Sequence, residues 1–178
     1  MSLLNNVNKI TFSSDKIGPT YKDFIETAKL AESYFKTKQN KTQIETSRKN
    51  SLWAYKKIPN SLNIIRNDRK IIGFVWIIPC SKSLMNKFLR KKISEAKLFK
   101  KLQEQKIDED NFESLYLCSS FIIPEYRRKG LATKAAIKTI RKLTQKRKIK
   151  PILFSWPYSK EGKLTILKAK NTINIKLR

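Results

Sequence analysis

The sequence contains no histidine and only two cysteines, Cys80 and Cys118. Both cysteines lie in apolar, strand-like runs, and they lack the spacing of metal ligands. A zinc site, a haem site and a histidine-based catalytic triad are therefore not expected, and we predict no metal.

Long apolar runs are also missing. No stretch of about 18 or more apolar residues is present, so the chain offers no candidate transmembrane helix. The amino-terminal residues MSLLNNVNKITFSSD lack the apolar core and the small-residue cleavage site of a secretory signal. We expect a soluble, cytoplasmic protein without a membrane partner.

Acidic residues are scarce, since 14 Asp and Glu oppose 40 Lys and Arg and leave a formal net charge of +26. A field of this sign attracts anions such as nucleic acid, lipid headgroups or a phosphorylated cofactor. The 31 lysines and nine arginines are spread along the whole chain and form no single stripe. Codon drift in an AT-rich genome produces this pattern, so we favour a solvated basic surface over a dedicated nucleic-acid site.

Low-complexity tails, flexible linkers and internal repeats are absent as well. The 178 residues, of which 40% are hydrophobic, suffice for one core but are too few for two ordinary domains. We expect one domain that spans residues 1–178.

The first half of the chain predicts a strand, two helices and a hairpin. Thr20 has the character of an N-cap with Asp23 at the third helical position, and an amphipathic helix follows it. Asn67-Asp68 forms a tight turn between two strands, and the second of these is apolar enough to be a central, buried strand. The other two elements are expected at residues 7–13, a strand, and 42–55, a weaker helix.

The second half predicts helices that alternate with strands. Residues 82–105 place apolar side chains among lysines, which indicates one or two helices. After a strand at 114–123, the clearest helix of the chain follows, with Ala132, Ala136, Ile140 and Leu143 on one face. The remaining elements are expected at 151–156, a strand, at 159–170, a short helix, and at 173–177, a final strand.

One segment, SFIIPEYRRKGLATKAAIKTI, carries the chemistry. It places a strand, a proline, a basic turn and a strong helix in succession. The first turn of a helix has backbone NH groups without intrahelical partners and the positive end of the helix dipole, so it binds a diphosphate. Gly130 has no side chain to block that approach, and the small Ala132 follows it. Residues 127–132, which we call the basic turn, are therefore a candidate anion site.

The basic turn resembles the Arg/Gln-x-x-Gly-x-Gly/Ala signature of the GNAT superfamily of acyl-CoA-dependent N-acetyltransferases. The strand before it and the helix after it stand where that family places them, and the resemblance covers roughly residues 7–170. It implies an α/β (α+β) fold with a mixed, mostly antiparallel sheet, helices on both faces and a parallel strand pair that splays at the cofactor site. Residues 82–105 would be a helical insertion in that fold, near the acceptor site.

The resemblance also implies an acetyl-CoA co-substrate and a primary amine as acceptor. Backbone groups of one strand end would pair with pantetheine and the acyl carbonyl, and main-chain NH groups of the basic turn would bind the pyrophosphate. A neutral amine would attack the thioester directly. The implied cofactor residues are Phe121, Ile122, Ile123, Arg127, Arg128, Lys129, Gly130, Leu131, Ala132 and Thr133.

The family's usual catalytic tyrosine is missing, because the expected position in the last helix is Leu167 or a neighbour. Tyr158, just before that helix, is the substitute candidate for the acid that protonates the thiolate. Glu113 and Tyr116 are candidates for the general base, although a surface role suits Glu113 as well. Cys118 has no evident activating base, so a buried thiol is favoured over a nucleophile.

Two functions follow from these observations. The favoured one is acetyl transfer from acetyl-CoA to a small amine, a peptide amino terminus or a lysine. The alternative is a GNAT-like module without catalysis that binds nucleic acid or another polyanion through its basic surface. Against the alternative, no recognition helix, exposed aromatic pair or glycine-clamped loop of a nucleic-acid module is evident.

Overall fold

A computed structural model describes residues 9–156 and 159–178 of the chain. Its centre is a five-stranded sheet whose strands follow their order in the chain. The pairs from β1 to β4 are antiparallel, and β4 and β5 are parallel. The predicted mixed, mostly antiparallel sheet is confirmed. The strands are β1 (Ile10–Phe12), β2 (Leu62–Asn67), β3 (Lys70–Cys80), β4 (Ser114–Ile122) and β5 (Ile152–Phe154).

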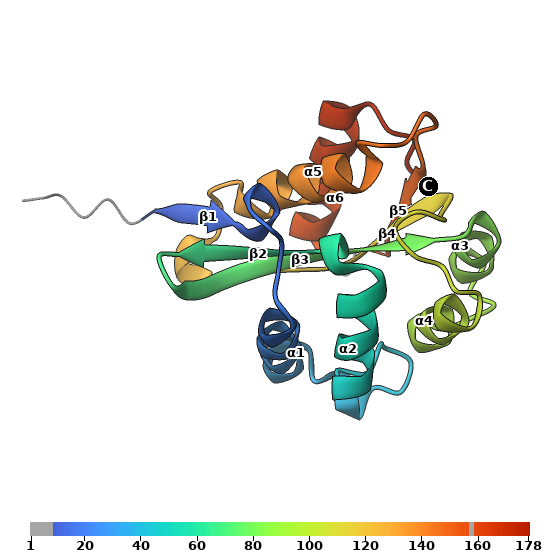
Figure 1. The fold of residues 1–178 in the computed structure, drawn as a ribbon, viewed down its shortest axis with the longest axis horizontal. Helices are drawn as coiled ribbons and strands as arrows, with labels where there is room; N and C mark the ends of the chain where they lie inside the picture. Colours follow the sequence, from blue (N-terminus) through green and yellow to red (C-terminus); the bar gives the residue numbers. More distant parts are fainter. Residues whose placement is uncertain (1–8, 157–158) are drawn as a thin grey trace, which may run out of the picture.

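Helices cover both faces of this sheet (Figure 1). α5 and α6 lie above the sheet in that view, α1, α2 and α4 lie below it, and α3 lies at its right-hand end. The predicted two-sided cover is confirmed, and residues 82–105 form two short helices. The helices are α1 (Tyr21–Phe35), α2 (Arg48–Lys57), α3 (Lys82–Leu89), α4 (Glu95–Glu104), α5 (Leu131–Thr144) and α6 (Lys160–Ile173).

The central strand β3 is buried, as its apolar sequence predicts. Ile72, Val75 and Ile77 have no exposed surface, because β2 and β4 pair with the two edges of β3 and helices cover its faces. Burying one such side chain contributes about 1.5–3 kcal/mol. β3 is therefore a rigid, buried neighbour against which β4 pairs.

The start of α1 follows the predicted capping box. The Thr20 hydroxyl accepts from the Asp23 NH at 3.2 Å, and the Asp23 carboxylate accepts from the Thr20 NH at 2.8 Å. Asp23 also forms an ion pair with Arg66 of β2. The cap therefore both begins the helix and fastens it to the sheet.

Two predicted elements differ in the structure. α2 begins after its N-cap Ser47, six residues later than expected, because Glu32 of α1 holds the preceding segment as a loop: it accepts hydrogen bonds from the hydroxyls of Thr37 and Thr46. The hydrogen bond from Thr37 is the largest cause that lowers the pKa of Glu32. The final strand is reduced to one bridge between Leu177 and Leu153, so the prediction of a sixth strand is wrong within the described residues.

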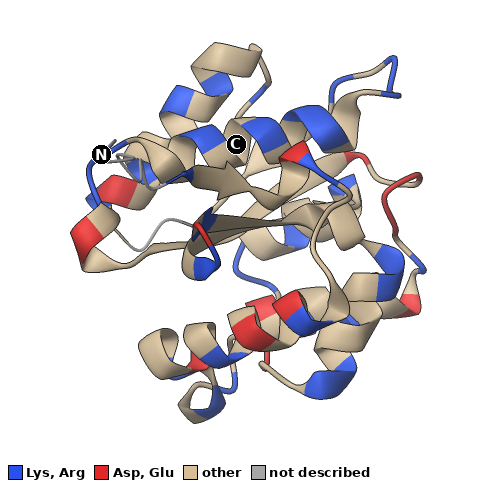
Figure 2. Cartoon of the chain, turned by 60° about the vertical axis from the view of Figure 1, so that its left-hand side comes forward, with Lys and Arg blue, Asp and Glu red and all other residues tan. Residues whose placement is uncertain are grey.

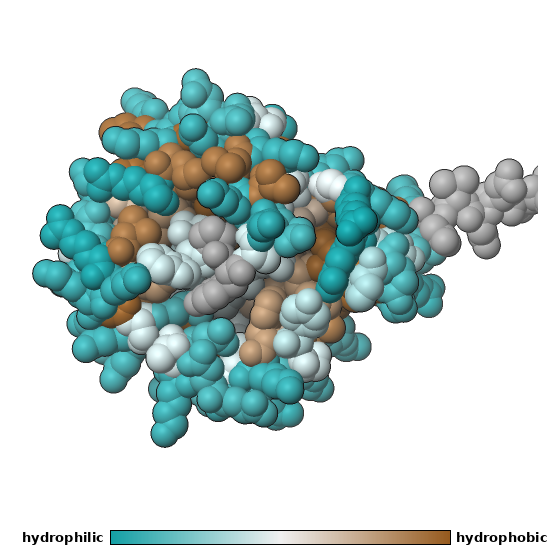
Figure 3. All heavy atoms as spheres, turned by 180° about the vertical axis from the view of Figure 1, so that it is seen from behind, coloured by the Kyte–Doolittle hydropathy of each residue, from teal (hydrophilic) through white to brown (hydrophobic). Residues whose placement is uncertain are grey.

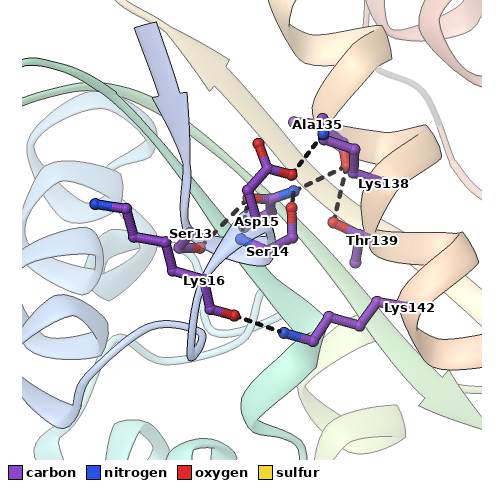
Figure 4. A network of polar contacts seen from close by, with 9 residues as sticks. Ser13, Ser14, Asp15, Lys16, Ala135, Lys138, Thr139 and Lys142 are labelled. Atoms are coloured by element: carbon purple, nitrogen blue, oxygen red, sulfur yellow. Dashed lines mark hydrogen bonds and ion pairs between the residues drawn. The ribbon is translucent and has the colours of Figure 1, made fainter. Parts of the chain in front are cut away.

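A polar network docks the segment after β1 onto α5 (Figure 4). The buried side chain of Asn63 in β2 accepts from the Ser14 NH at 3.3 Å and donates to the Ala135 carbonyl at 3.1 Å. Lys138 of α5 pairs with Asp15, and Lys142 donates to the Lys16 carbonyl at 3.4 Å. Two α5 lysines that the sequence places on a solvated face therefore help to set the position of this helix.

Candidate functional site

The basic turn connects the end of β4 to the start of α5. After a 3-10 turn at Pro124–Tyr126, the backbone is extended at Arg127 and enters the left-handed region at Arg128 (φ 62°) and Gly130 (φ 70°). The Tyr126 hydroxyl accepts from the Asn67 side chain at 2.6 Å, which ties this turn to the β2–β3 hairpin. The turn is thus held by the sheet and has a defined path into the helix.

The amino terminus of α5 presents unpaired donors, as predicted. Gly130 is the N-cap, and the first intrahelical bond runs from the Lys134 NH to the Gly130 carbonyl at 3.0 Å. The NH groups of Leu131, Ala132 and Thr133 precede that bond, so they have no intrahelical acceptor. No other described residue accepts from them. With the positive dipole end of a 14-residue helix, they form a site suited to a diphosphate.

Gly130 is required for its backbone conformation. Its φ of 70° lies in the left-handed region, which glycine adopts without strain. A Cβ atom added here would meet no atom within 4 Å. The space beside the residue is therefore open.

The three basic side chains of the turn point in different directions. Arg127 reaches back along β4, where its Nε donates to the Ile122 carbonyl at 2.8 Å. Its guanidinium also donates to the Tyr34 hydroxyl of α1 at 3.2 Å. Lys129 lies over the Tyr126 ring, 5.1 Å from its centroid, while Arg128 is exposed. Arg127 therefore links the strand end to α1, and Arg128 is the least restrained of the three.

β4 and β5 separate halfway along β4. β5 pairs only with Ser114–Tyr116, and one further contact, from the Ser155 hydroxyl to the Leu117 carbonyl at 3.0 Å, closes the pair. From Cys118 to Ile122, no described strand adjoins this edge of β4. The predicted splay is present, and it leads directly into the basic turn.

Backbone direction decides which residues of this strand end a ligand could reach. The Ile123 NH donates to the Ile72 carbonyl, so it faces β3. Because the backbone groups of successive strand residues point to opposite edges, Phe121 also faces β3, whereas Ser120 and Ile122 face the open side. The Ile122 carbonyl on that side is the group that Arg127 occupies. Among the three strand residues that the sequence singles out, the geometry favours Ile122.

β3 and β4 lie unusually close beside this edge. Gly73 of β3 pairs with Ile122, and a Cβ atom at Gly73 would lie 2.5 Å from the Phe121 carbonyl oxygen. Only glycine permits this approach. Gly73 therefore helps to fix the path of β4 where the strand is open on its other edge.

A β-bulge interrupts β4 at the point of separation. The pairing with β3 passes from Ser119↔Trp76 to Leu117↔Ile77, so Cys118 is the additional residue. Bulges re-aim side chains and leave ladder groups unpaired. Cys118, the bulged residue of β4, thus directly follows Leu117, which makes the last contact with the β5 side.

A carboxylate that the sequence did not reveal meets this bulge. Glu95, the first residue of α4, accepts from the Tyr116 hydroxyl at 2.6 Å and from the Cys118 thiol at 3.6 Å. Its other oxygen accepts from the Ile44 NH at 3.2 Å. In the sequence, Ser94-Glu95 indicates only the start of a helix. The contact of the Glu95 carboxylate with β4 depends on how α4 packs against the strand.

Of the two predicted catalytic residues, Glu113 and Tyr158, the structure describes only Glu113. Glu113 lies before β4, where its carboxylate accepts from the Lys82 NH at 3.0 Å and caps the start of α3. At about 3.3 Å per residue, the nine residues from Glu113 to Ile122 span roughly 30 Å. Tyr158 lies outside the described residues. Tyr116, the other candidate base, is 1% exposed and stacks on Phe154 with ring centroids 5.0 Å apart.

The surroundings of both cysteines, Cys80 and Cys118, keep the thiols protonated. Burial raises the pKa of Cys80 to about 12. Burial also raises the pKa of Cys118 well above its usual value, and the adjacent Glu95 carboxylate adds to that shift. A thiol attacks as its thiolate, so a protonated Cys118 is a weak nucleophile. The structure supports the prediction of a structural thiol.

The tryptophans divide between the core and the surface. Trp53 and Trp76 both pack on Phe99, with centroid distances of 5.3 and 5.6 Å. Trp156 is 39% exposed, with the Lys91 ammonium 5.2 Å from its ring centroid. Trp53 and Trp76 are therefore partly buried against the core, whereas Trp156 lies at the surface.

The fold is similar to solved structures, whereas the sequence comparisons found no match. No family model and no curated protein matches the sequence. A solved structure that the chain is similar to is diaminobutyrate acetyltransferase EctA from Paenibacillus lautus, in complex with L-2,4-diaminobutyric acid and coenzyme A. The TM-score is 0.42 at 12% sequence identity, over 79% of this chain and 59% of that chain. This chain thus aligns with less than two thirds of that protein's length.

Proposed function

We propose that this protein transfers an acetyl group from acetyl-CoA to a primary amine. One observation carries the proposal: a β-strand that is open along half its length runs directly into a helix amino terminus with three unpaired NH groups. The open edge suits the amide groups of a pantetheine arm, and the helix start suits a diphosphate. Coenzyme A carries both groups in this order.

The cofactor residues follow from the geometry of the turn. Main-chain NH groups of residues 128–133 are the pyrophosphate ligands in this proposal, and Ile122 is the main strand contact. Arg127 has to release the Ile122 carbonyl when the pantetheine arm takes its place, since both groups compete for the same edge. The freed guanidinium then adds its charge beside the phosphates.

The chemistry needs little from the side chains. A thioester is an activated acyl group, and its thiolate, with an ordinary pKa near about 8.5, is a tolerable leaving group. A neutral amine attacks the carbonyl carbon, the C–S bond breaks, and the thiolate takes a proton. Tyr158 remains the candidate donor for that proton, and Glu113 is assigned no part because it caps α3.

Thermal unfolding with and without acetyl-CoA tests the proposal. A ligand at about 100 times its dissociation constant adds about 2.7 kcal/mol to the free energy of unfolding, so the melting temperature should rise by several degrees. Inorganic pyrophosphate and heparin serve as controls for anion binding in general. An equal rise with heparin, and none with millimolar acetyl-CoA, would support the second candidate, a polyanion-binding module.

The second candidate is supported by charge alone. Figure 2 shows Lys and Arg on the helices of both layers and on several loops, without one concentrated stripe. A duplex or a single strand of nucleic acid requires a continuous basic track. The distribution therefore favours the acetyltransferase.

A further inference from the structure

The bulge of β4 contacts a carboxylate of α4, Glu95, that has no ion-pair partner among the described residues. The described residues form three ion pairs, and Glu95 belongs to none of them. The chain nevertheless has 40 Lys and Arg against 14 Asp and Glu. A carboxylate without an ion-pair partner at a partly buried position can accept a cation from outside the chain, and the positive end of the α4 dipole keeps Glu95 ionised until one binds.

The surroundings of Glu95 hold its carboxylate in one orientation. The Tyr116 hydroxyl, the Cys118 thiol and the Ile44 NH donate to it from three different segments of the chain. These are neutral donors, so they orient the carboxylate without cancelling its charge. Glu95 and Cys118 both retain part of their exposed surface.

The position of Glu95 beside the bulge places its carboxylate near the proposed path of acetyl-CoA along β4. Cys118 directly follows Leu117, the last β4 residue with a contact to the β5 side. A pantetheine arm that runs along the open edge from the basic turn toward that contact ends at Cys118. The carboxylate and the thioester would then meet across the bulge.

We infer that Glu95 binds the acceptor, a primary alkylammonium group, and takes a proton from it. The inference rests on the acetyltransferase function proposed above and names the acceptor class and its base. The carboxylate accepts one proton from the ammonium ion and passes it to solvent. The neutral nitrogen forms a bond to the acetyl carbon, the C–S bond breaks, and the second nitrogen proton ends on the departing thiolate. The products are the N-acetylamine, the thiol of coenzyme A and one released proton.

Glu95→Gln tests the inference, because it removes the charge and keeps an oxygen for the Ile44 NH. The two probe acceptors are 1,4-diaminobutane, which is charged near neutral pH, and hydroxylamine, which is not. We expect kcat/KM for the diamine to fall about a hundredfold or more, as is typical when a positioned base is lost. The rate with hydroxylamine, corrected for its uncatalysed reaction, should stay within about threefold because it needs no deprotonation.

Two further variants complete the design. Glu104→Gln removes the same charge from the exposed end of the same helix, and it should leave both rates unchanged. Glu95→Asp keeps the charge, so it should recover at least about a tenth of the rate with the diamine even if Glu95→Gln weakens the fold. The acetyl-CoA melting shift, measured on each variant, reports on the fold and the cofactor site separately.

The outcomes distinguish a failure of the proposed acetyltransferase function from a failure of the role inferred for Glu95. If wild-type protein shows no acetyl-CoA shift, the proposed function fails and the inference fails with it. If acetyl-CoA binds, the inference alone is overturned by any of three results: Glu95→Gln retains its rate with the diamine, it loses both rates equally, or the wild type acetylates hydroxylamine and not the diamine.

Discussion

Single residues in this protein have roles that depend on backbone conformation more than on their side chains. Gly130 is the clearest example, because its φ of 70° sets the direction of the first turn of α5. Arg128 adopts the same region at a cost, since a residue with a Cβ atom pays about 1–2 kcal/mol there. The two left-handed positions on either side of Lys129 therefore set the path of the turn into α5.

Exchange of Gly130 for Asp or Asn gives a matched test of the anion site. Both side chains tolerate the left-handed region better than most, they have nearly the same shape, and the added Cβ atom meets no neighbour. Only Asp brings a negative charge to the place of the proposed pyrophosphate. We expect Gly130→Asp to weaken acetyl-CoA binding at least about tenfold relative to Gly130→Asn, a difference of about 1.4 kcal/mol.

Isothermal titration of both variants with acetyl-CoA measures that difference. Asp at a helix amino terminus interacts favourably with the helix dipole, so Gly130→Asp should melt no lower than Gly130→Asn. Equal affinities in the two folded variants would show that the basic turn does not bind the cofactor phosphates.

At the scale of elements, contacts between β2 and α5 position the helix that begins at the site. Asn63 makes this connection through its amide, which bonds to the segment after β1 on one side and to Ala135 on the other. Neither the amide nor its partners reach solvent freely, because Asn63 has no exposed surface. The orientation of the α5 amino terminus therefore depends on a buried amide far from the turn itself.

Asn63→Ala should destabilise the fold by about 1–3 kcal/mol, since it removes the acceptor of the buried Ser13 hydroxyl and one donor to the Ala135 carbonyl. Chemical denaturation measures this as a lower midpoint at an unchanged slope. Asn171→Ala, on the exposed face of α6, serves as the control and should change stability by less than about 0.5 kcal/mol. A midpoint for Asn63→Ala equal to that of the control would show that the network contributes nothing to stability.

Local sequence signals predicted the elements whose causes are local. The capping box at Thr20 and the tight turn between β2 and β3 are each contained in a few residues; the cap appears as expected, and the turn lies at Asp68-Arg69, one residue later than predicted, because Asn67 still pairs with Lys70. The start of α2 and the final strand were mistaken because distant partners decide them: Glu32 holds residues 37–46 as a loop, and Leu177 finds only one bridging partner.

The candidate site shows the same division. A strand, a basic turn and a helix in succession are visible in the sequence, and the structure has them in that order, while the role of the turn as a cofactor site stays a prediction. Glu95 was not predicted, because its contact with β4 joins residues 21 and 23 positions apart through the packing of α4. Glu113 was chosen for its nearness to β4 in sequence, and the structure shows that its carboxylate is directed to α3.

At the scale of the whole molecule, the net charge of +26 acts on every anion that approaches. Long-range attraction of this kind raises association rates and is screened by salt, with a Debye length of about 8 Å at physiological ionic strength. No helix in the described part of the chain is long and apolar enough to cross a membrane.

Salt dependence separates a diffuse basic surface from a dedicated nucleic-acid site. If lysines spread over both layers hold an oligonucleotide, its affinity depends on counterion release from about 6–10 phosphates and falls about 10³-fold or more between 50 and 200 mM salt. We expect a 20-nucleotide DNA to follow that slope in fluorescence anisotropy, while acetyl-CoA, held by directed NH groups in one turn, loses far less affinity. Exchange of one exposed lysine, such as Lys100→Glu on α4, should reduce DNA affinity only slightly. DNA binding that survives 200 mM salt, or that this one substitution abolishes, would instead locate a specific nucleic-acid site and favour the non-catalytic module.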